Sequence, residues 1–150
     1  MTNKGKVTKL NIMKAKATHV SKLQFNLVSD SNHAIVVDAS TKLSYDHGSR
    51  PKELLLMSLI SCTGMDVVSL LNKMRVEFDK FSVSAEAENA EMHPKVFKYV
   101  NIKYFISGKS IDKKKLEKAI NLSQDRYCPV TAMMKKACKI NHSYEISEGI

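Results

Sequence analysis

The stretch RPKELLLMSLISCTGMDVVSLLNKMR, residues 50–75, decides which folds the rest of the sequence can adopt. Pro51 suits the first position of a helix, and we predict a helix from about Lys52 to Arg75. Apolar residues occupy nearly every side of its first turns, which is typical of a buried helix. A chain of 150 residues has difficulty surrounding such a helix unaided. We therefore expect either a sheet wrapped around it or burial against a partner subunit.

Two features of this helix constrain its surroundings. Gly64 lies inside it and costs about 1 kcal/mol relative to alanine, so we expect another backbone to approach closely there. Polar residues such as Ser58, Asp66 and Asn72 interrupt the apolar stretch from Leu54 to Met74. This polarity predicts that the helix does not span a membrane.

The flanking segments predict an α+β fold. We predict strands at roughly residues 5–16, 23–28, 34–39, 81–88, 96–107 and 140–147. The first three form an antiparallel meander, and the next two form a hairpin through residues 90–95. Asp112 can cap a second helix, a short helix follows at 130–137, and the last strand is edge-like.

Composition indicates one globular domain spanning residues 1–150. Hydrophobic residues make up 43% and charged residues 26%, and the three cysteines do not suit a secreted disulfide framework. No export signal is recognisable at the start of the sequence. We therefore expect a cytoplasmic protein that does not bind membranes.

The net charge of +9 raises the question of nucleic-acid binding. The basic residues are nearly all lysines, and only Arg50, Arg75 and Arg126 carry the guanidinium fork that suits phosphate and guanine. Aromatic residues, on which bases stack, make up only 7%. We prefer a basic, solvated surface over a nucleic-acid interface.

The cysteines are the candidate chemical groups. Cys128 precedes Pro129 at the start of a short helix, where the helix dipole and free amides favour a thiolate and lower the thiol pKa. Cys62 lies in mid-helix, where an apolar environment raises the pKa. Reactivity of Cys62 then requires a cation. Arg50 is the nearest arginine in sequence, but lies about 18 Å away along the helix axis.

The simpler alternative is that each cysteine is a small buried hydrophobic residue, as free cysteines usually are. From spacing alone this alternative is preferred for Cys62 and equally good for Cys128, and we interpret Cys138 as structural or incidental. No CxxC motif occurs, and the five histidines show no ligand spacing. The sequence thus predicts no metal site and no cofactor.

Three segments together resemble the OsmC/Ohr family of thiol-dependent peroxidases, and its OsmC-like branch above all. They are RPKELLLMSLISCTGMDVVSLLNKMR, HPKVFKYVNIKYFISG and AINLSQDRYCPVTAMM. The resemblance covers about residues 20–147. It rests on a proline, a Glu-Leu pair and a cysteine in one helix, followed by Tyr-Cys-Pro-Val at the start of a later one.

The resemblance implies an OsmC-like fold in which antiparallel sheets wrap a long central helix in an intertwined homodimer. It implies that Cys62 attacks an organic hydroperoxide and becomes a sulfenic acid, which Cys128 converts to a disulfide. A dithiol reductant resembling dihydrolipoamide would restore the pair. The function implied is defence against oxidative stress.

Two positions depart from the family pattern. Lys52 directly follows the helix proline, where well-studied hydroperoxide reductases have a glutamate that orients an activating arginine. That arginine comes from the N-terminal strands, and this sequence has none before Arg50. Lys22, Arg50 and Lys52 are the candidates to activate Cys62, and we name Arg50 with Cys62 and Cys128 as the catalytic residues.

Two other functions fit the same residues. The net charge and the missing activating residues suit an OsmC-like binding protein without peroxidase activity, for a small apolar ligand or nucleic acid. A thiol exchange protein acting on a substrate other than peroxide is the third interpretation.

Overall fold

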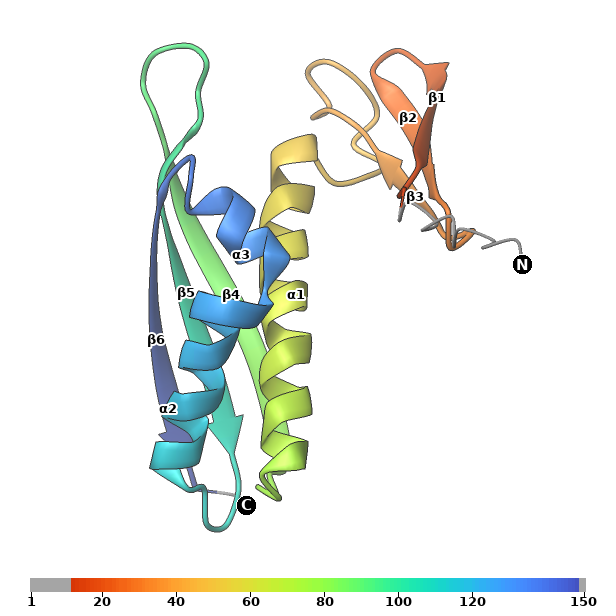
Figure 1. The fold of residues 1–150 in the computed structure, drawn as a ribbon. Coiled ribbons are helices and arrows are strands. Elements are labelled where there is room, and N and C mark those ends of the chain that lie inside the picture. The colour runs from red at the N-terminus through yellow and green to blue at the C-terminus, as the bar shows by residue number, and fades with distance from the viewer. Residues whose placement is uncertain (1–11, 149–150) are drawn as a thin grey trace, which may run out of the picture. The chain divides into compact units, whose positions relative to one another are not determined.

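Strands and helices follow one another in the predicted order in this computed structural model, which describes residues 12–148 (Figure 1). The elements are β1 (Ala15–Ser21), β2 (Gln24–Ser29), β3 (Ala34–Val37), α1 (Pro51–Lys73), β4 (Lys80–Asn89), β5 (Phe97–Ser107), α2 (Lys113–Leu122), the π-helical turn η1 (Ser123–Tyr127), α3 (Pro129–Met134) and β6 (Lys139–Ser147). The α+β class predicted from the sequence is confirmed.

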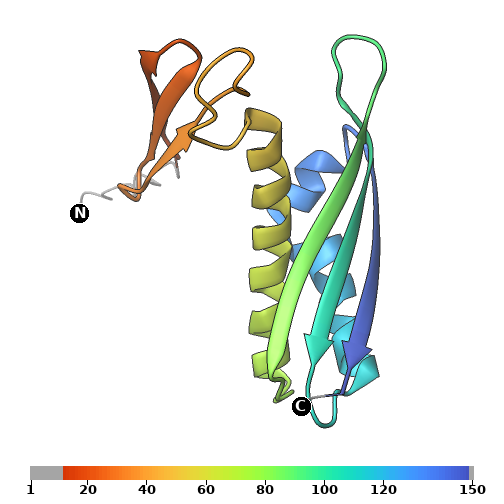
Figure 2. The ribbon, with the colours of Figure 1, turned by 180° about the vertical axis from the view of Figure 1, so that it is seen from behind.

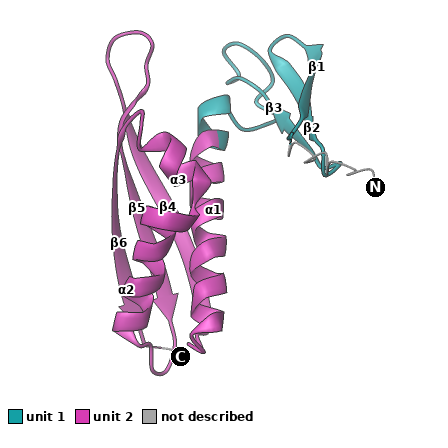
Figure 3. Cartoon of the chain, in the orientation of Figure 1, with its two compact units in different colours: residues 1–54 teal, residues 55–150 magenta. Residues whose placement is uncertain are grey.

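The chain divides into two compact units, residues 1–54 and 55–150 (Figure 3). Each is described by itself below, and the assignment of one domain stays a prediction. In the first unit β1, β2 and β3 pair in sequence order as an antiparallel sheet, which confirms the meander.

The first strand was predicted at residues 5–16, and only the end of this range can be compared with the structure. Residues 1–11 lie outside the described part of the chain, and β1 begins only at Ala15. The chain turns back at Lys22, which has a φ of 48°, so the segment before this turn pairs with β2. The sequence did not indicate a turn at Lys22, because lysine rarely adopts a left-handed backbone conformation.

In the second unit β4 and β5 form the predicted antiparallel hairpin, but β6 pairs parallel to β5. The sheet order β4-β5-β6 is therefore mixed, and our expectation of antiparallel sheets is wrong for this edge. A parallel neighbour needs a crossover connection, which α2, η1 and α3 supply. Figures 1 and 2 show the helices on one face of this sheet.

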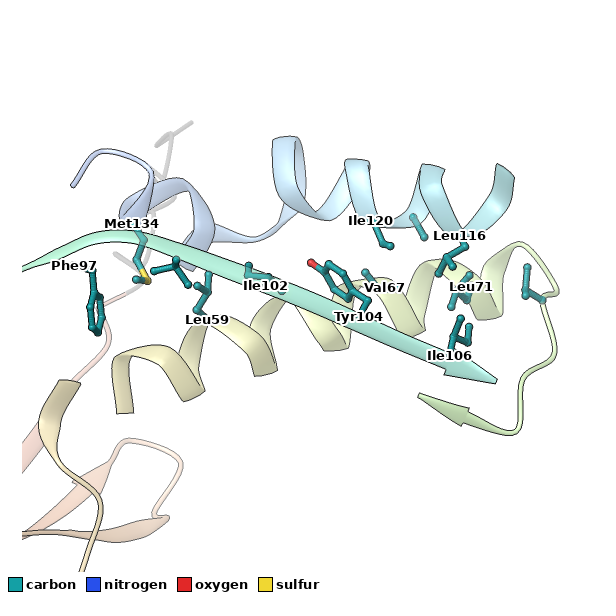
Figure 4. Close-up of a cluster of buried hydrophobic side chains, with 13 residues drawn as sticks. Leu59, Val67, Leu71, Phe97, Ile102, Tyr104, Ile106, Leu116, Ile120 and Met134 are labelled. Carbon is teal, nitrogen blue, oxygen red and sulfur yellow. The ribbon is translucent and has the colours of Figure 1, made fainter. Parts of the chain in front are cut away.

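The core of the second unit lies between α1, β5 and α2 (Figure 4). Every fourth residue of α1 faces it, and alternate residues of β5 meet that face, as helix and strand periods require. The buried residues are Leu59, Thr63, Val67 and Leu71 from α1, Val100, Ile102, Tyr104 and Ile106 from β5, and Leu116, Ala119 and Ile120 from α2.

Residues 55–148 leave the rest of α1 exposed. Leu55, Met57 and Met65 expose 43%, 48% and 74% of their surface, so α1 is covered on one face only. By length and composition alone α1 could cross a membrane, with a mean hydropathy of 1.9. We expected the polar residues of α1 to rule out a membrane-spanning helix, but by this measure they do not. Its buried face nevertheless packs against the core of the second unit.

The surroundings of Gly64 also differ from the prediction. A Cβ atom at this position would lie 3.3 Å from Cγ2 of Val83 and 3.9 Å from Cε1 of Phe81. Both are side-chain atoms of β4. Gly64 therefore makes room for side chains of the sheet, and the neighbouring backbone that we expected is not what fills this space.

Candidate functional site

Cys62 and Cys128 meet in the second unit. Their two Sγ atoms and a carboxylate oxygen of Asp66 all lie within 4.8 Å of one another. Cys128 is buried, and Cys62 and Asp66 are half-buried. The fold thus assembles two thiols and one carboxylate from segments that are distant in sequence.

Local structure explains how each group reaches this place. Cys62 and Asp66 are four residues apart on α1, which puts them on the same side of the helix. Cys128 is the N-cap of α3, as predicted, and its Sγ accepts a hydrogen bond of 3.3 Å from the backbone N–H of Thr131. Pro129 occupies the first helical position after it.

Asp66 is the member of the site that sequence analysis missed. We counted this residue only among the polar interruptions of an apolar helix. Its spacing from Cys62 was visible in the sequence, because residues four apart on a helix are neighbours. Nothing in the sequence indicated that Cys128 would join the same pair.

The environment of Cys62 opposes ionisation. Burial raises the pKa of its thiol to about 11, and a hydrogen bond with the Cys128 thiol and the charge of Asp66 act in the same direction. The backbone N–H of Val130 opposes this and lowers the pKa. The rise confirms the effect expected of a mid-helix cysteine. Among residues 55–148, no cation is a main cause of this pKa shift.

A chain of hydrogen bonds runs from the core to Asp66. Gln124 Nε2 lies 2.7 Å from the Tyr104 hydroxyl, which lies 2.6 Å from Thr63 Oγ1. Thr63 Oγ1 lies 2.8 Å from Ser123 Oγ, which donates to Asp66 Oδ2 over 3.0 Å. Four of these five residues are buried, and the chain joins α1, β5 and η1.

The carboxylate fixes the direction of every bond in this chain. Ionised Asp66 can only accept, so the single proton of the Ser123 hydroxyl points to it. Thr63 must then donate to Ser123, Tyr104 must donate to Thr63, and the Gln124 amide must donate to Tyr104. Bonds aligned in one direction polarise one another, and this chain holds the Asp66 carboxylate in place beside the thiols.

The π-helical turn makes this chain possible. Ser123 and Gln124, consecutive in sequence, are 0% and 3% exposed and contribute to the same network. The widened turn η1 contains both residues, and such turns often occur at functional sites. Buried Gln124 Oε1 and Thr131 Oγ1 have no hydrogen-bond partner within the described residues.

Arg50 belongs to the first unit, where its guanidinium forms an ion pair with Asp46. Its backbone N–H donates to the Glu53 side chain over 2.9 Å. Lys22, another candidate activator, places its ammonium group 4.2 Å from the centre of the Tyr45 ring in the same unit. The activating role of Arg50 stays a prediction.

Cys138 does not belong to the thiol cluster. Its Sγ donates to the backbone carbonyl of Met134 over 3.7 Å, and burial raises its thiol pKa. Within residues 12–148, the only group of three potential metal ligands from Cys, His, Asp and Glu is the one formed by Cys62, Asp66 and Cys128. Our sequence analysis judged ligand spacing only within local motifs, so it did not consider this group, and the expectation of no metal site stays a prediction.

The fold and this arrangement of thiols define an OsmC-like protein. A family profile described as "OsmC-like protein" matches residues 44–143, two thirds of the chain. The chain is also 34% identical over 134 residues to Protein YhfA of Escherichia coli strain K12, covering 89% of this chain and 98% of the relative. The chain belongs to the OsmC family, and the resemblance stated from the sequence is confirmed.

Solved structures share the fold. A hypothetical protein from Aquifex aeolicus VF5 is 29% identical, with a TM-score of 0.83 and coverage of 94% of this chain and 100% of the other. The organic hydroperoxide resistance protein OhrB of Bacillus subtilis is 14% identical, with a TM-score of 0.60 and coverage of 89% and 98%. At this identity the likeness to OhrB shows the fold alone.

Proposed function

We propose that the protein reduces organic hydroperoxides with the thiols of Cys62 and Cys128. The Cys62 thiolate attacks the outer peroxide oxygen, the O–O bond breaks, and the alcohol leaves after taking up a proton. The resulting sulfenic acid is attacked by the Cys128 thiolate, and water leaves as the disulfide forms. A dithiol then returns two electrons and two protons and becomes a disulfide itself.

The observation that carries this proposal is the placement of the two Sγ atoms within 4.8 Å of each other. A disulfide bond is about 2.05 Å long, so a modest rotation of one or both side chains would bring the sulfurs into bonding range. The proposal also draws on relatives of the same fold, one of which is named an organic hydroperoxide resistance protein.

Organic hydroperoxides suit the site better than hydrogen peroxide. An apolar groove on α1 and β4 is lined by Met57, Ile60, Met65, Val68 and Phe81, and it lies next to Cys62 in sequence through Ser61, although the thiols are not part of its lining. Apolar walls favour a substrate with a hydrocarbon part over a small, strongly hydrated peroxide. We propose that the reductant is a dithiol of the lipoamide kind and that the protein works in the reducing cytoplasm.

Activation of Cys62 is the demanding step in this function, because its thiol pKa is about 11. A guanidinium beside the sulfur would favour the thiolate. We propose Arg50 for this role. Because about 18 Å of helix separates Arg50 from Cys62, it can act only from a partner chain or through a folded-back loop. Under this proposal Arg50→Ala slows peroxide-dependent oxidation of Cys62, whereas Arg126→Ala leaves the rate unchanged. Equal rates in wild type and Arg50→Ala would remove Arg50 from the mechanism.

The exposed face of α1 supports a homodimer. Leu55, Met57 and Met65 are large apolar side chains at least 43% exposed on one helix, and such a face is stabilised by burial against a second copy. We expect Met65→Lys to shift the protein from dimer to monomer in light scattering after gel filtration. Met92→Lys changes an equally apolar, 81% exposed residue in the β4–β5 connection and should leave the dimer intact.

The peroxidase proposal is tested by mass spectrometry of the protein, first reduced in chelator-containing buffer and then exposed to stoichiometric cumene hydroperoxide. We expect a peptide pair joined through Cys62 and Cys128 in wild type. Cys128→Ser should instead accumulate oxidised Cys62. Cys138→Ser is the matched control, since it removes a cysteine outside the cluster and should still form the link.

The opposite outcome would favour a second function. If both thiols stay reduced while a model thiol is oxidised, peroxide reduction by this pair is excluded. An OsmC-like binding protein for a small apolar ligand is then preferred, and the groove between α1 and β4 is its candidate site.

A further inference from the structure

We propose that the reduced thiol pair is also a zinc site, in which Cys62 Sγ, Cys128 Sγ and a carboxylate oxygen of Asp66 bind one Zn²⁺ ion. This goes beyond the proposed peroxidase function, because zinc binding requires neither a peroxide nor a disulfide. The three side chains supply the ligands, and a water molecule would complete a tetrahedral shell, as in zinc sites with three protein ligands.

The distances suit this ion. Tetrahedral zinc with Zn–S bonds of about 2.3 Å places two thiolate sulfurs about 3.8 Å apart. The three ligand atoms already lie within 4.8 Å of one another, so the two sulfurs need to close by at most about 1 Å and a sulfur and the oxygen by at most about 1.3 Å. Rotation of side chains can supply a change of this size without movement of α1 or α3.

The second argument is the support that the ligands receive. The Ser123 hydroxyl donates to Asp66 Oδ2, and the chain through Thr63 and Tyr104 orders that hydroxyl. A carboxylate has two oxygens with several acceptor sites, so one bond from Ser123 leaves Asp66 able to bind a metal. The N–H of Thr131 orients Cys128 Sγ in the same way. Such outer partners orient the ligands in protein metal sites.

The ligand types decide which ion is preferred. Two thiolates and one carboxylate suit the borderline-soft Zn²⁺, whereas Mg²⁺ and Ca²⁺ prefer sites made of oxygen atoms alone. Binding releases the two thiol protons to the solvent and changes no oxidation state. Because the same sulfurs cannot bind zinc and form a disulfide, zinc would protect the reduced pair from oxidation.

The first test uses wild-type protein alone. Reduced, metal-free protein is treated with iodoacetamide with and without Zn²⁺, and each cysteine is followed by mass spectrometry. We expect Zn²⁺ to slow alkylation of Cys62 and Cys128, and Cys138 in the same molecule should react at the same rate in both samples. Equal rates at Cys62 and Cys128 with and without Zn²⁺ would overturn the proposal.

The second test measures affinity by competition with a chromophoric zinc indicator. We expect one Zn²⁺ per chain, and Asp66→Asn or Cys128→Ser should weaken binding by more than the roughly 10–100-fold that loss of an outer partner costs. Ser123→Ala should weaken it within that range, and Cys138→Ser should leave it unchanged. Wild-type affinity in Asp66→Asn would refute the three-ligand site.

Far-UV circular dichroism shows whether each variant folds, and Co²⁺ provides a separate check of thiolate binding. Bound Co²⁺ gives a thiolate-to-cobalt charge-transfer band, which wild type and Cys138→Ser should show and Zn²⁺ should abolish. Absence of this band in folded, reduced wild type would contradict thiolate binding. Failure of these metal-binding tests would not argue against peroxide reduction, because that activity is measured with a chelator present and without added metal.

Discussion

The hydroxyl groups of Thr63 and Tyr104 lie 2.6 Å apart and both residues are fully buried, so a polar contact joins the middle of α1 to the middle of β5. This contact belongs to the chain that ends at Asp66. An apolar core of this kind tolerates polar groups only when they are bonded to one another. The link therefore connects the stability of the fold to the geometry of the thiol site.

We expect Tyr104→Phe to lower the free energy of unfolding by about 1–3 kcal/mol, the usual effect of leaving buried polar partners unsatisfied. The partners that lose the hydroxyl are Thr63 Oγ1 and the Gln124 amide, which keep a hydrogen bond of 3.2 Å to each other, so we expect a loss near the lower end of this range. Urea denaturation measures the change.

Tyr99→Phe is the matched control for this experiment. The Tyr99 hydroxyl donates to Glu88 over 2.7 Å, but this bond is exposed to solvent. Water can replace it, so we expect a much smaller loss of stability. Equal losses of unfolding free energy in the two variants would show that the buried hydrogen bonds stabilise the protein no more than an exposed one.

Asp66→Asn should make Cys62 more reactive toward iodoacetamide in chelator-containing buffer. The negative charge of Asp66 raises the pKa of the Cys62 thiol, so removing the charge lowers that pKa and increases the thiolate fraction at neutral pH. Each unit of decrease raises the thiolate fraction about tenfold while the pKa stays well above the pH. Burial, the larger cause, remains.

Asp125→Asn controls for the general loss of a negative charge. Its side chain is 73% exposed on η1 and forms an ion pair with Lys135. We expect the alkylation rate of Cys62 to be unchanged in this variant. A slower reaction of Cys62 in Asp66→Asn would mean that the carboxylate assists ionisation of the thiol.

Asp38 should make the first unit sensitive to acid. Burial raises the pKa of its carboxyl group, but hydrogen bonds from Ser44 and from the backbone N–H groups of His47, Ala39 and Tyr45 outweigh this and lower the pKa to about 2. The ordinary value is 3.8. The stabilisation is therefore present above about pH 4 and is lost as the pH falls toward 2.

The measurement is the thermal midpoint of wild type and Asp38→Asn as a function of pH. Wild type should be the more stable protein at neutral pH, and the difference should shrink between about pH 4 and pH 2. A difference that is constant over this range would show that the ionised carboxylate does not matter.

Gly64→Ala should raise the free energy of unfolding by up to about 1 kcal/mol, through the higher helix propensity of alanine. The added Cβ would lie 3.3 Å from Cγ2 of Val83, which is only half-buried and can shift by a few tenths of an ångström. Gly64→Leu keeps the propensity gain but requires β4 to move, and should destabilise the protein. Urea denaturation of both variants separates the effects.

Local patterns predicted the parts of the fold that depend on nearby residues. The alternation in residues 81–88 predicted a strand, and β4 spans this range. Asp112 and Cys128 are N-caps as expected. The same patterns do not indicate which strands pair with one another or in which direction. A strand such as β6 shows the same residue pattern whether it runs parallel or antiparallel to β5, so its direction could not be predicted.

The site was predictable only in part for the same reason. The family resemblance implied that Cys62 and Cys128 meet, and the structure places their sulfurs close together. The roles of Ser123 and Gln124 depend on the widened turn η1, which brings two consecutive residues into one buried network. A regular helical period, on which the prediction relied, separates such neighbours by about 100°.

The donor and acceptor roles along the hydrogen-bond chain that ends at Asp66 are coupled, so they can only reverse together. A proton placed on the carboxylate would turn Asp66 from an acceptor into a donor, and Ser123, Thr63 and Tyr104 could then all reverse their O–H groups. The Gln124 amide would follow by turning its oxygen toward Tyr104. The orientation of one amide in the core thus reports, through three hydroxyl groups, whether the carboxylate beside the thiols carries a proton.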